Sequence, residues 1–144
     1  MYRETIWTHG DVRIVLMDSM SQVVQDDRGA IVVAGSNGGQ ESGNVGVAAR
    51  CGFVLLNDAG VGKDRAGVVG LDVLQAGGIA AATVSHESAE ISDARDMWAE
   101  GVVSYANEAA TALGVVPGLA ARSAVQHLAR LWAGEPSTSP GGAS

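Results

Sequence analysis

The sequence has one cysteine, few aromatic residues and no long hydrophobic run. Because Cys51 is the only cysteine among 144 residues, no disulfide can form within the chain, and a reducing compartment is expected. No apolar run approaches the roughly 18 residues that a membrane-spanning helix needs. The N-terminal residues lack the apolar segment of a signal peptide. These absences predict a cytoplasmic protein without a membrane partner.

Positive charge is also scarce. The chain has 9 Lys and Arg residues against 16 Asp and Glu residues, which gives a formal net charge of −7. This balance argues against nucleic acid and against an anionic membrane surface as partners. A small anionic substrate remains compatible, because a local site can be positive in an acidic protein.

Small apolar residues and glycine are abundant instead. Hydrophobic residues make up 47% of the chain, aromatic residues only 4%, and there are 20 glycines. A core of Val, Ala, Ile and Leu joined by tight turns is typical of a layered α/β fold. The length predicts a single α/β domain over residues 1–133. Residues 134–144, which are rich in Ser, Pro and Gly, are expected to form a disordered tail.

Four short apolar runs predict the core strands. Each run is almost continuously apolar, which is typical of parallel strands that are buried on both faces; they cover residues 12–17, 30–34, 53–56 and 80–84. Residues 4–7 predict an antiparallel edge strand, with a turn over residues 8–11 leading into the first core strand.

Helical spacing of apolar residues, together with Gly and Asp at the ends, predicts four helices over residues 44–50, 64–75, 92–113 and 120–132. Asp64 and Asp93 are expected as N-caps of the second and third helices. Strands that alternate with helices predict a three-layer α/β sandwich. Its sheet would have four or five mostly parallel strands, in a Rossmann-like or flavodoxin-like arrangement.

Polar residues follow all four predicted core strands. In an open α/β sheet, ligands bind outside the carboxyl ends of the strands. The polar segments at those ends are residues 18–19, 35–43, 57–64 and 85–88. We therefore expect one polar site where these segments converge.

The residue types in these segments predict acid–base or nucleophilic chemistry. Ser36 lies in an A-x-S-x-G variant of the nucleophile elbow, and Asp58 and His86 follow it in the order of a hydrolase triad. His86 would act as the base and Asp58 would orient it. Lys63 would add positive charge or act as a base or nucleophile. The alternatives are that Ser36 donates to the loop backbone and that His86 is a structural histidine, satisfied by a helix N-terminus.

The same segments supply the predicted substrate contacts. Backbone N–H groups of glycines can hold a phosphate or carboxylate, and Asn and Ser side chains can hydrogen-bond a substrate. The residues assigned to substrate binding are Gly35, Asn37, Gly38, Gly39, Asn57, Ser85 and Ser88. A P-loop is excluded, because Asn57 and Asp64 stand where that motif requires Gly and Ser or Thr. A turn-rich loop without a ligand remains the alternative.

No metal or cofactor is predicted. Oxygen ligands for a hard cation could come from Asp18, Asp58, Asp64 or Glu87, but no spacing requires it. One cysteine and three scattered histidines do not favour zinc. Hydrolase and lyase reactions need no redox cofactor, and nothing in the sequence indicates one.

Two functions remain open at this point. The first is an enzyme of hydrolase or lyase type that acts on a small anionic, amide- or carbonyl-bearing metabolite. The alternative is a non-catalytic ligand-binding or accessory subunit of a multi-component enzyme. A homo-oligomer is expected in either case, because Trp98 and Trp132 lie on helix faces that one small sheet does not fully cover.

Overall fold

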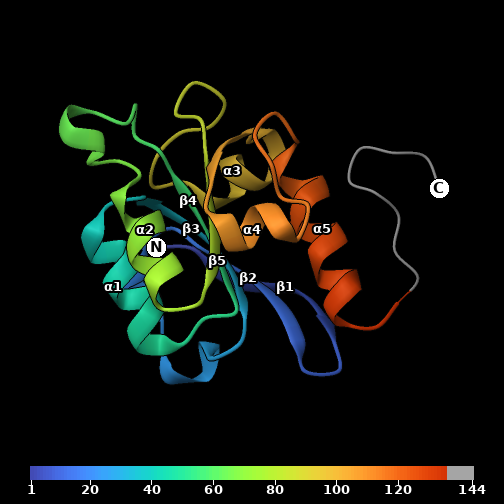
Figure 1. The fold of residues 1–144 in the computed structure, drawn as a ribbon. Helices are drawn as coiled ribbons and strands as arrows, with labels where there is room; N and C mark the ends of the chain where they lie inside the picture. The colour runs from blue at the N-terminus through green and yellow to red at the C-terminus, as the bar shows by residue number, and fades with distance from the viewer. Residues whose placement is uncertain (136–144) are drawn as a thin grey trace.

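Six strands form one mixed sheet, and their order in space is their order in the sequence (Figure 1). The computed structural model describes residues 1–135. The central four strands are parallel, whereas the first and last strands pair antiparallel with their neighbours. The strands are β1 (Arg3–His9), β2 (Val12–Met17), β3 (Ile31–Asn37), β4 (Phe53–Asn57), β5 (Ala80–Val84) and β6 (Val103–Ala106).

The predicted sandwich with a mostly parallel sheet of four or five strands is therefore wrong. The sheet has six strands and an antiparallel pair at each edge. Rossmann and flavodoxin sheets also contain a point where the strand order reverses, and that point creates their ligand crevice. The sequential order found here has no such reversal, so a site at this sheet edge must be shaped by its loops.

The error arises in the segment predicted as one helix over residues 92–113. The structure divides it into α3 (Ala94–Glu100), β6 and α4 (Glu108–Ala112). Gly101 is extended and ends α3, and the Asn107 side chain caps α4 by accepting from the N–H of Ala110. The apolar residues of this segment fit the spacing of a helix, but those of β6 also fit the alternating pattern of a short edge strand. Spacing alone therefore did not distinguish a helix from a strand.

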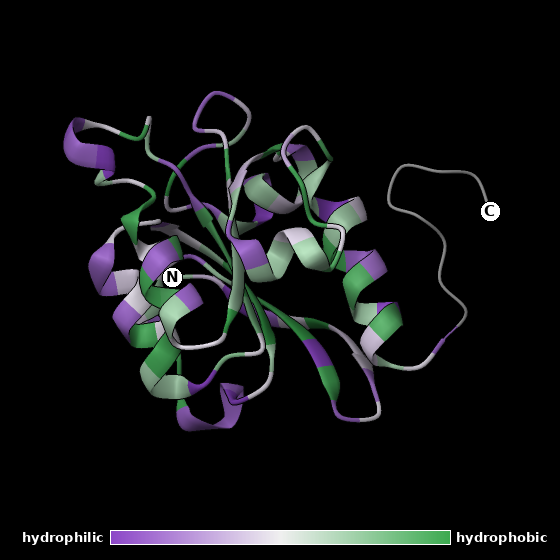
Figure 2. Cartoon of the chain, in the orientation of Figure 1, coloured by the Kyte–Doolittle hydropathy of each residue, from purple (hydrophilic) through white to green (hydrophobic). Residues whose placement is uncertain are grey.

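The core strands themselves are confirmed. The predictions for residues 12–17 and 80–84 match β2 and β5, while β3 and β4 extend past the predicted ends to Asn37 and Asn57. The edge strand is also confirmed as antiparallel, although β1 is longer than predicted. Figure 2 shows the hydrophobic strands between the helices.

Helices cover both faces of this sheet. The helices α1 (Gln40–Ala49) and α2 (Val69–Ala76) pack on one face, against a cluster that includes Val32 and Val54. The other face carries α3, α4 and α5 (Ala121–Trp132), against a cluster that includes Ile31 and Phe53. Right-handed connections between sequential parallel strands place every crossover helix on the same face. The second face is therefore covered by the helices that follow β5.

Two of the predicted helices begin elsewhere. The helix α1 starts at Gln40 rather than residue 44. Glycine is favoured at position 43 of this helix because α2 packs so close that a Cβ there would lie 2.8 Å from the Gly70 carbonyl oxygen. The helix α2 starts at Val69, so Asp64 is not its N-cap. Asp64 has a φ of 56° inside the short 3-10 helix η3 (Lys63–Arg65). Two further 3-10 turns, η1 (Met20–Gln22) and η2 (Gln25–Asp27), connect β2 to β3.

The remaining helix predictions are confirmed. Asp93 caps α3, since its Oδ1 accepts from the N–H of Asp96 at 3.0 Å, and α5 ends at Trp132 as expected.

Cys51 is buried, and burial raises the pKa of its thiol to about 11. No helix within residues 1–135 is long and apolar enough to cross a membrane. Of the predicted disordered tail, only Gly134 and Glu135 lie within the described residues. The Glu135 Oε1 lies 3.3 Å from His9 Nδ1.

Candidate functional site

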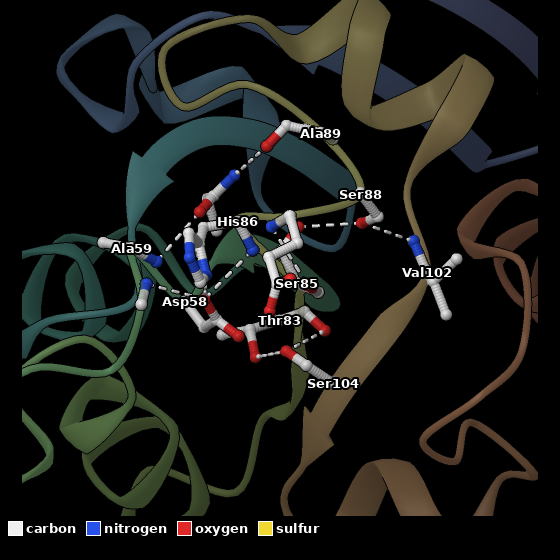
Figure 3. A network of polar contacts seen from close by, with 12 residues as sticks. Asp58, Ala59, Thr83, Ser85, His86, Ser88, Ala89, Val102 and Ser104 are labelled. Carbon is white, nitrogen blue, oxygen red and sulfur yellow. Dashed lines mark hydrogen bonds and ion pairs between the residues drawn. The ribbon is translucent and has the colours of Figure 1, made fainter.

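The ends of β4 and β5 bring Asp58 and His86 together. Asp58 is the first residue after β4, and His86 is the second residue after β5. The Asp58 Oδ1 lies 3.4 Å from the His86 Nδ1 (Figure 3). The carboxylate side chain is only 6% exposed, whereas the imidazole is 51% exposed. A buried acid therefore sits behind an accessible base.

The same carboxylate oxygen also holds the two loops together. It accepts from the backbone N–H of Gly60 at 2.8 Å and from that of His86 at 3.1 Å. The imidazole lies over Gly60, where a Cβ would be 3.6 Å from the ring. Since Asp58 lies beside Nδ1, Nε2 is the ring nitrogen that has no carboxylate in contact with it among residues 1–135.

Asn57 is completely buried and fixes the neighbouring backbone. Its Nδ2 donates to the carbonyl of Ala89 at 3.0 Å, and its Oδ1 accepts from the N–H of Ala59 at 2.8 Å. Both groups of this amide are therefore bonded within the protein. Asn57 positions the loops around the imidazole, and its contacts do not favour the substrate-binding role assigned from the sequence.

Ser85 and Ser88 shape the loop that carries His86. The Ser85 Oγ accepts from the N–H of Glu87 at 3.0 Å. The Ser88 Oγ donates to the carbonyl of Ser85 at 2.8 Å and accepts from the N–H of Val102 at 3.0 Å. Figure 3 shows these bonds tying the loop to the start of β6. The structure thus brings both serines near His86, with their hydroxyls in bonds to the backbone.

The loop after Asp58 is held in strained backbone conformations. Residues Ala59, Val61, Asp64 and Arg65 have φ values of 52°, 67°, 56° and 59°. Such values are rare for residues other than glycine, and for a β-branched residue such as Val61 they are true outliers. The loop is closed by hydrogen bonds of 2.7 Å from Val61 N to Asp58 O and from Gly67 N to Val61 O.

Strain of this kind is concentrated at functional sites in proteins, at a cost of about 1–3 kcal/mol per residue. The sequence offered no sign of it apart from the glycines of the loop. Lys63 is exposed in the same loop, which projects from the sheet edge (Figure 1). The positively charged Lys63 side chain is therefore close in sequence to Asp58.

Ser36 lies in a different environment. Its Oγ accepts from the N–H of Met20 at 2.8 Å, which ties the end of β3 to the turn after β2. It lines an open pocket of about 350 Å³ that contains five serines, together with Asn37 and Glu41. Neither Asp58 nor His86 lines this pocket, and within residues 1–135 no hydrogen bond joins Ser36 to either of them. Ser36 therefore bonds to a backbone group, but it accepts from the turn after β2 rather than donating within its own loop as the alternative had it.

The glycines of residues 35–39 are explained by contacts within the chain. A Cβ on Gly35 would lie 2.5 Å from the carbonyl oxygen of Asp18, and one on Gly38 would clash with the carbonyl oxygen of Gly67. The N–H of Gly38 donates to Asn57 O at 2.8 Å, and the N–H of Gly39 donates to the Asn37 side chain at 2.9 Å. These N–H groups are already used, so their arrangement does not favour an anion cradle.

The carboxylates considered for a cation do not converge. Asp18 accepts from the N–H groups of Tyr2 and Ala94, both at 3.0 Å. Partial burial acts to raise its pKa, but these two hydrogen bonds prevail and the pKa of Asp18 is lowered. Asp64 and Glu87 are exposed. Across the described part of the chain, no group of three or more His, Cys, Asp or Glu side chains is placed to hold a metal ion.

Comparisons with known proteins do not add a functional assignment. No protein-family model, curated protein or solved structure matches this chain. The chemistry of the residues at the sheet edge is therefore the basis for the function proposed below.

Proposed function

We propose that this protein is an enzyme of hydrolase or lyase type that acts on a small anionic metabolite bearing an amide or carbonyl group. In this proposal, His86 is the general acid–base. The observation that supports it is the Asp58–His86 pair, in which a buried carboxylate contacts Nδ1 of a half-exposed imidazole at 3.4 Å. A carboxylate in this position fixes the tautomer and the orientation of a catalytic histidine.

The geometry supports a simple proton-transfer role. In the proposed step the neutral imidazole carries its proton on Nδ1, beside Asp58, and Nε2 accepts a proton from a water that attacks the substrate carbonyl and later returns it to the leaving group. In a lyase, the same nitrogen takes a proton from the carbon next to the carbonyl. General acid–base catalysis of this kind contributes about 10²–10⁴-fold in rate. Because Ser36 bonds to Met20 instead, we propose water rather than Ser36 as the nucleophile.

Lys63 is the proposed contact for the anionic group of the substrate. It is exposed, and it lies in the strained loop that begins at Asp58. This loop follows β4, and the loop with His86 follows β5, the strand paired with β4. Lys63→Met is therefore expected to raise KM for an anionic substrate more than it lowers kcat.

The experiment is a turnover screen of the purified protein over small amides, esters, keto acids and hydroxy acids. His86→Gln is the test variant. His9→Gln is the matched control, because His9 is also half-exposed beside a carboxylate but lies in the β1–β2 hairpin. We expect turnover to fall by about 10²-fold or more in His86→Gln and to persist in His9→Gln. Equal activity in both variants would contradict the proposal.

A non-catalytic ligand-binding or accessory subunit is the second candidate. It is favoured by the serine-lined pocket, since that pocket contains neither member of the Asp58–His86 pair. Specific binding of a metabolite without turnover, unaffected by His86→Gln, would support this alternative.

We also propose a cytoplasmic location, which the free, buried Cys51 supports. We further propose a homo-oligomer, which the exposure of Leu131 and Trp132 at the end of α5 supports. Sedimentation of a 14.6 kDa monomer alone at micromolar concentration would contradict the oligomer.

A further inference from the structure

A second cavity lies between the β1–β2 hairpin and the helices α3 and α5. Its volume is about 250 Å³, and it shares no residue with the loops that carry Asp58 and His86. Figure 1 shows α5 beside the hairpin, on the face of the sheet that α3 and α4 also cover. The buried side chains of Ile14 and Ala129 form its inner wall.

Two tryptophans line this cavity in a chain that is poor in aromatic residues. The sequence has three tryptophans, and two of them, Trp7 and Trp98, are half-buried here. Indole rings offer large, rigid surfaces against which another ring can pack. A dry cavity of about 150 Å³ is enough to bind benzene. The present cavity therefore has room for one aromatic ring with a short side arm.

The polar residues at the cavity lie on the exposed side of α5. Gln126 and Arg130 are spaced by four residues, so both lie on one face of the helix together with Ala129. Among residues 1–135, Arg130 is the only charged residue that lines the cavity. Within residues 1–135 no carboxylate lies within ion-pair distance of its guanidinium, whereas Arg95 of α3 already stacks on the Tyr2 ring at 4.3 Å.

We propose that this cavity binds a small aromatic carboxylate. The ring packs between Trp7 and Trp98, and the carboxylate pairs with Arg130 at the mouth. A guanidinium matches the two oxygens of a carboxylate with parallel hydrogen bonds, so it selects an acid over its neutral amide. The site is separate from the proposed catalytic pair and does not depend on its activity.

The test uses phenylacetate and phenylacetamide, which share a ring and differ in charge. Binding to the purified full-length protein is followed by isothermal titration calorimetry and by tryptophan fluorescence. We expect saturable binding of phenylacetate with a Kd about tenfold lower than that of phenylacetamide, since a charge-assisted hydrogen bond contributes on the order of tenfold in affinity. Equal affinity for the two compounds, or no saturation by phenylacetate at millimolar concentration, would overturn the proposal.

Variants locate the binding in the cavity. Arg130→Gln should bring phenylacetate to the affinity of the amide, while Arg122→Gln, an exposed arginine two turns earlier on α5, should leave it unchanged. Gln126→Phe places a ring at the mouth from an exposed position, so it should block binding without lowering Tm. Full binding by Gln126→Phe, or equal losses in the two arginine variants, would place phenylacetate elsewhere and refute the assignment.

Discussion

Two buried carboxylates, Asp27 and Asp58, have opposite surroundings. Asp27 is fully buried and paired with Arg3 through two hydrogen bonds of 3.0 and 2.7 Å. Asp58 is almost as buried, but the side chain beside it is the half-exposed imidazole of His86. The first pair is closed and holds β1 to the turn before β3. The second pair has a half-exposed imidazole, so it is open to solvent, as the proposed acid–base role of His86 requires.

The largest effect on stability is expected from Asp27→Asn. An amide in place of the carboxylate leaves Arg3 without its charge partner. The new NH2 group also faces an N–H donor, either of Arg3 or of Val24, and cannot accept from it. Breaking a buried ion pair costs about 3 kcal/mol. Urea unfolding should show this loss, while Asp26→Asn, an exposed neighbour, should change the free energy of unfolding little. Equal stability of the two variants would contradict the structural role of Asp27.

The same pair predicts how stability depends on pH. Burial acts to raise the pKa of Asp27, but hydrogen bonds from Arg3 and Val24 outweigh it and lower the pKa. A carboxyl group with a lowered pKa in the folded state contributes stability above its unfolded pKa of about 3.9. That contribution is lost as the pH falls through the folded pKa. Unfolding free energies measured between about pH 7 and pH 3 should therefore fall less steeply in Asp27→Asn than in the wild type.

Asn107 provides an intermediate effect. Its amide accepts from the N–H groups of Ala81 and Ala110 and donates to the carbonyls of Leu71 and Ile79, so it joins α2, β5 and α4. Replacement by Ala leaves buried polar groups unpaired, which costs about 1–3 kcal/mol. Thermal unfolding should show a lower Tm for Asn107→Ala. A Tm equal to that of Asn44→Ala, which changes an exposed residue of α1, would refute this role.

The smallest effect is expected from Val61→Gly, which sharpens the comparison at the Asp58 end. Glycine adopts the φ of 67° without the penalty of a β-branched side chain, which is a gain of about 1 kcal/mol. The gain is offset by the greater freedom of the unfolded chain and by the lost packing of the half-buried Val61 against the core, so chemical denaturation should show a stability close to that of the wild type. A loss of more than about 1 kcal/mol would mean that Val61 is held by packing rather than under strain.

The sequence was sufficient to predict the core strands, where successive residues are all buried. Continuous apolar runs identified the core strands, because parallel strands that are buried on both faces must be apolar throughout. The same regularity failed for residues 92–113. Gly101 ends α3 and Asn107 caps the start of α4, and neither role follows from the spacing of apolar residues.

The site could be predicted in part. Polar residues at strand ends indicated Asp58 and His86, which the structure does bring together. Ser36 occupies the next strand end, but its hydroxyl turns toward Met20, and no spacing in the sequence indicates that direction. The pairing of Arg3 with Asp27 and the strain at Val61 depend on three-dimensional contacts and backbone angles, so neither had a local signal.

The proposed role of His86 is tested most directly by the kinetics of Asp58→Asn, His86→Gln and the double variant on a substrate found in the turnover screen. The Oδ1 of asparagine can still accept hydrogen bonds from the N–H groups of Gly60 and His86. Asp58→Asn therefore removes the charge and keeps the contacts between the loops. If the two residues act as one unit, as proposed, His86→Gln loses about 10²-fold or more in kcat/KM and the double variant loses no more than that. Wild-type kcat/KM in His86→Gln, with a lowered Tm, would contradict the catalytic role and leave the imidazole as a structural contact of Asp58.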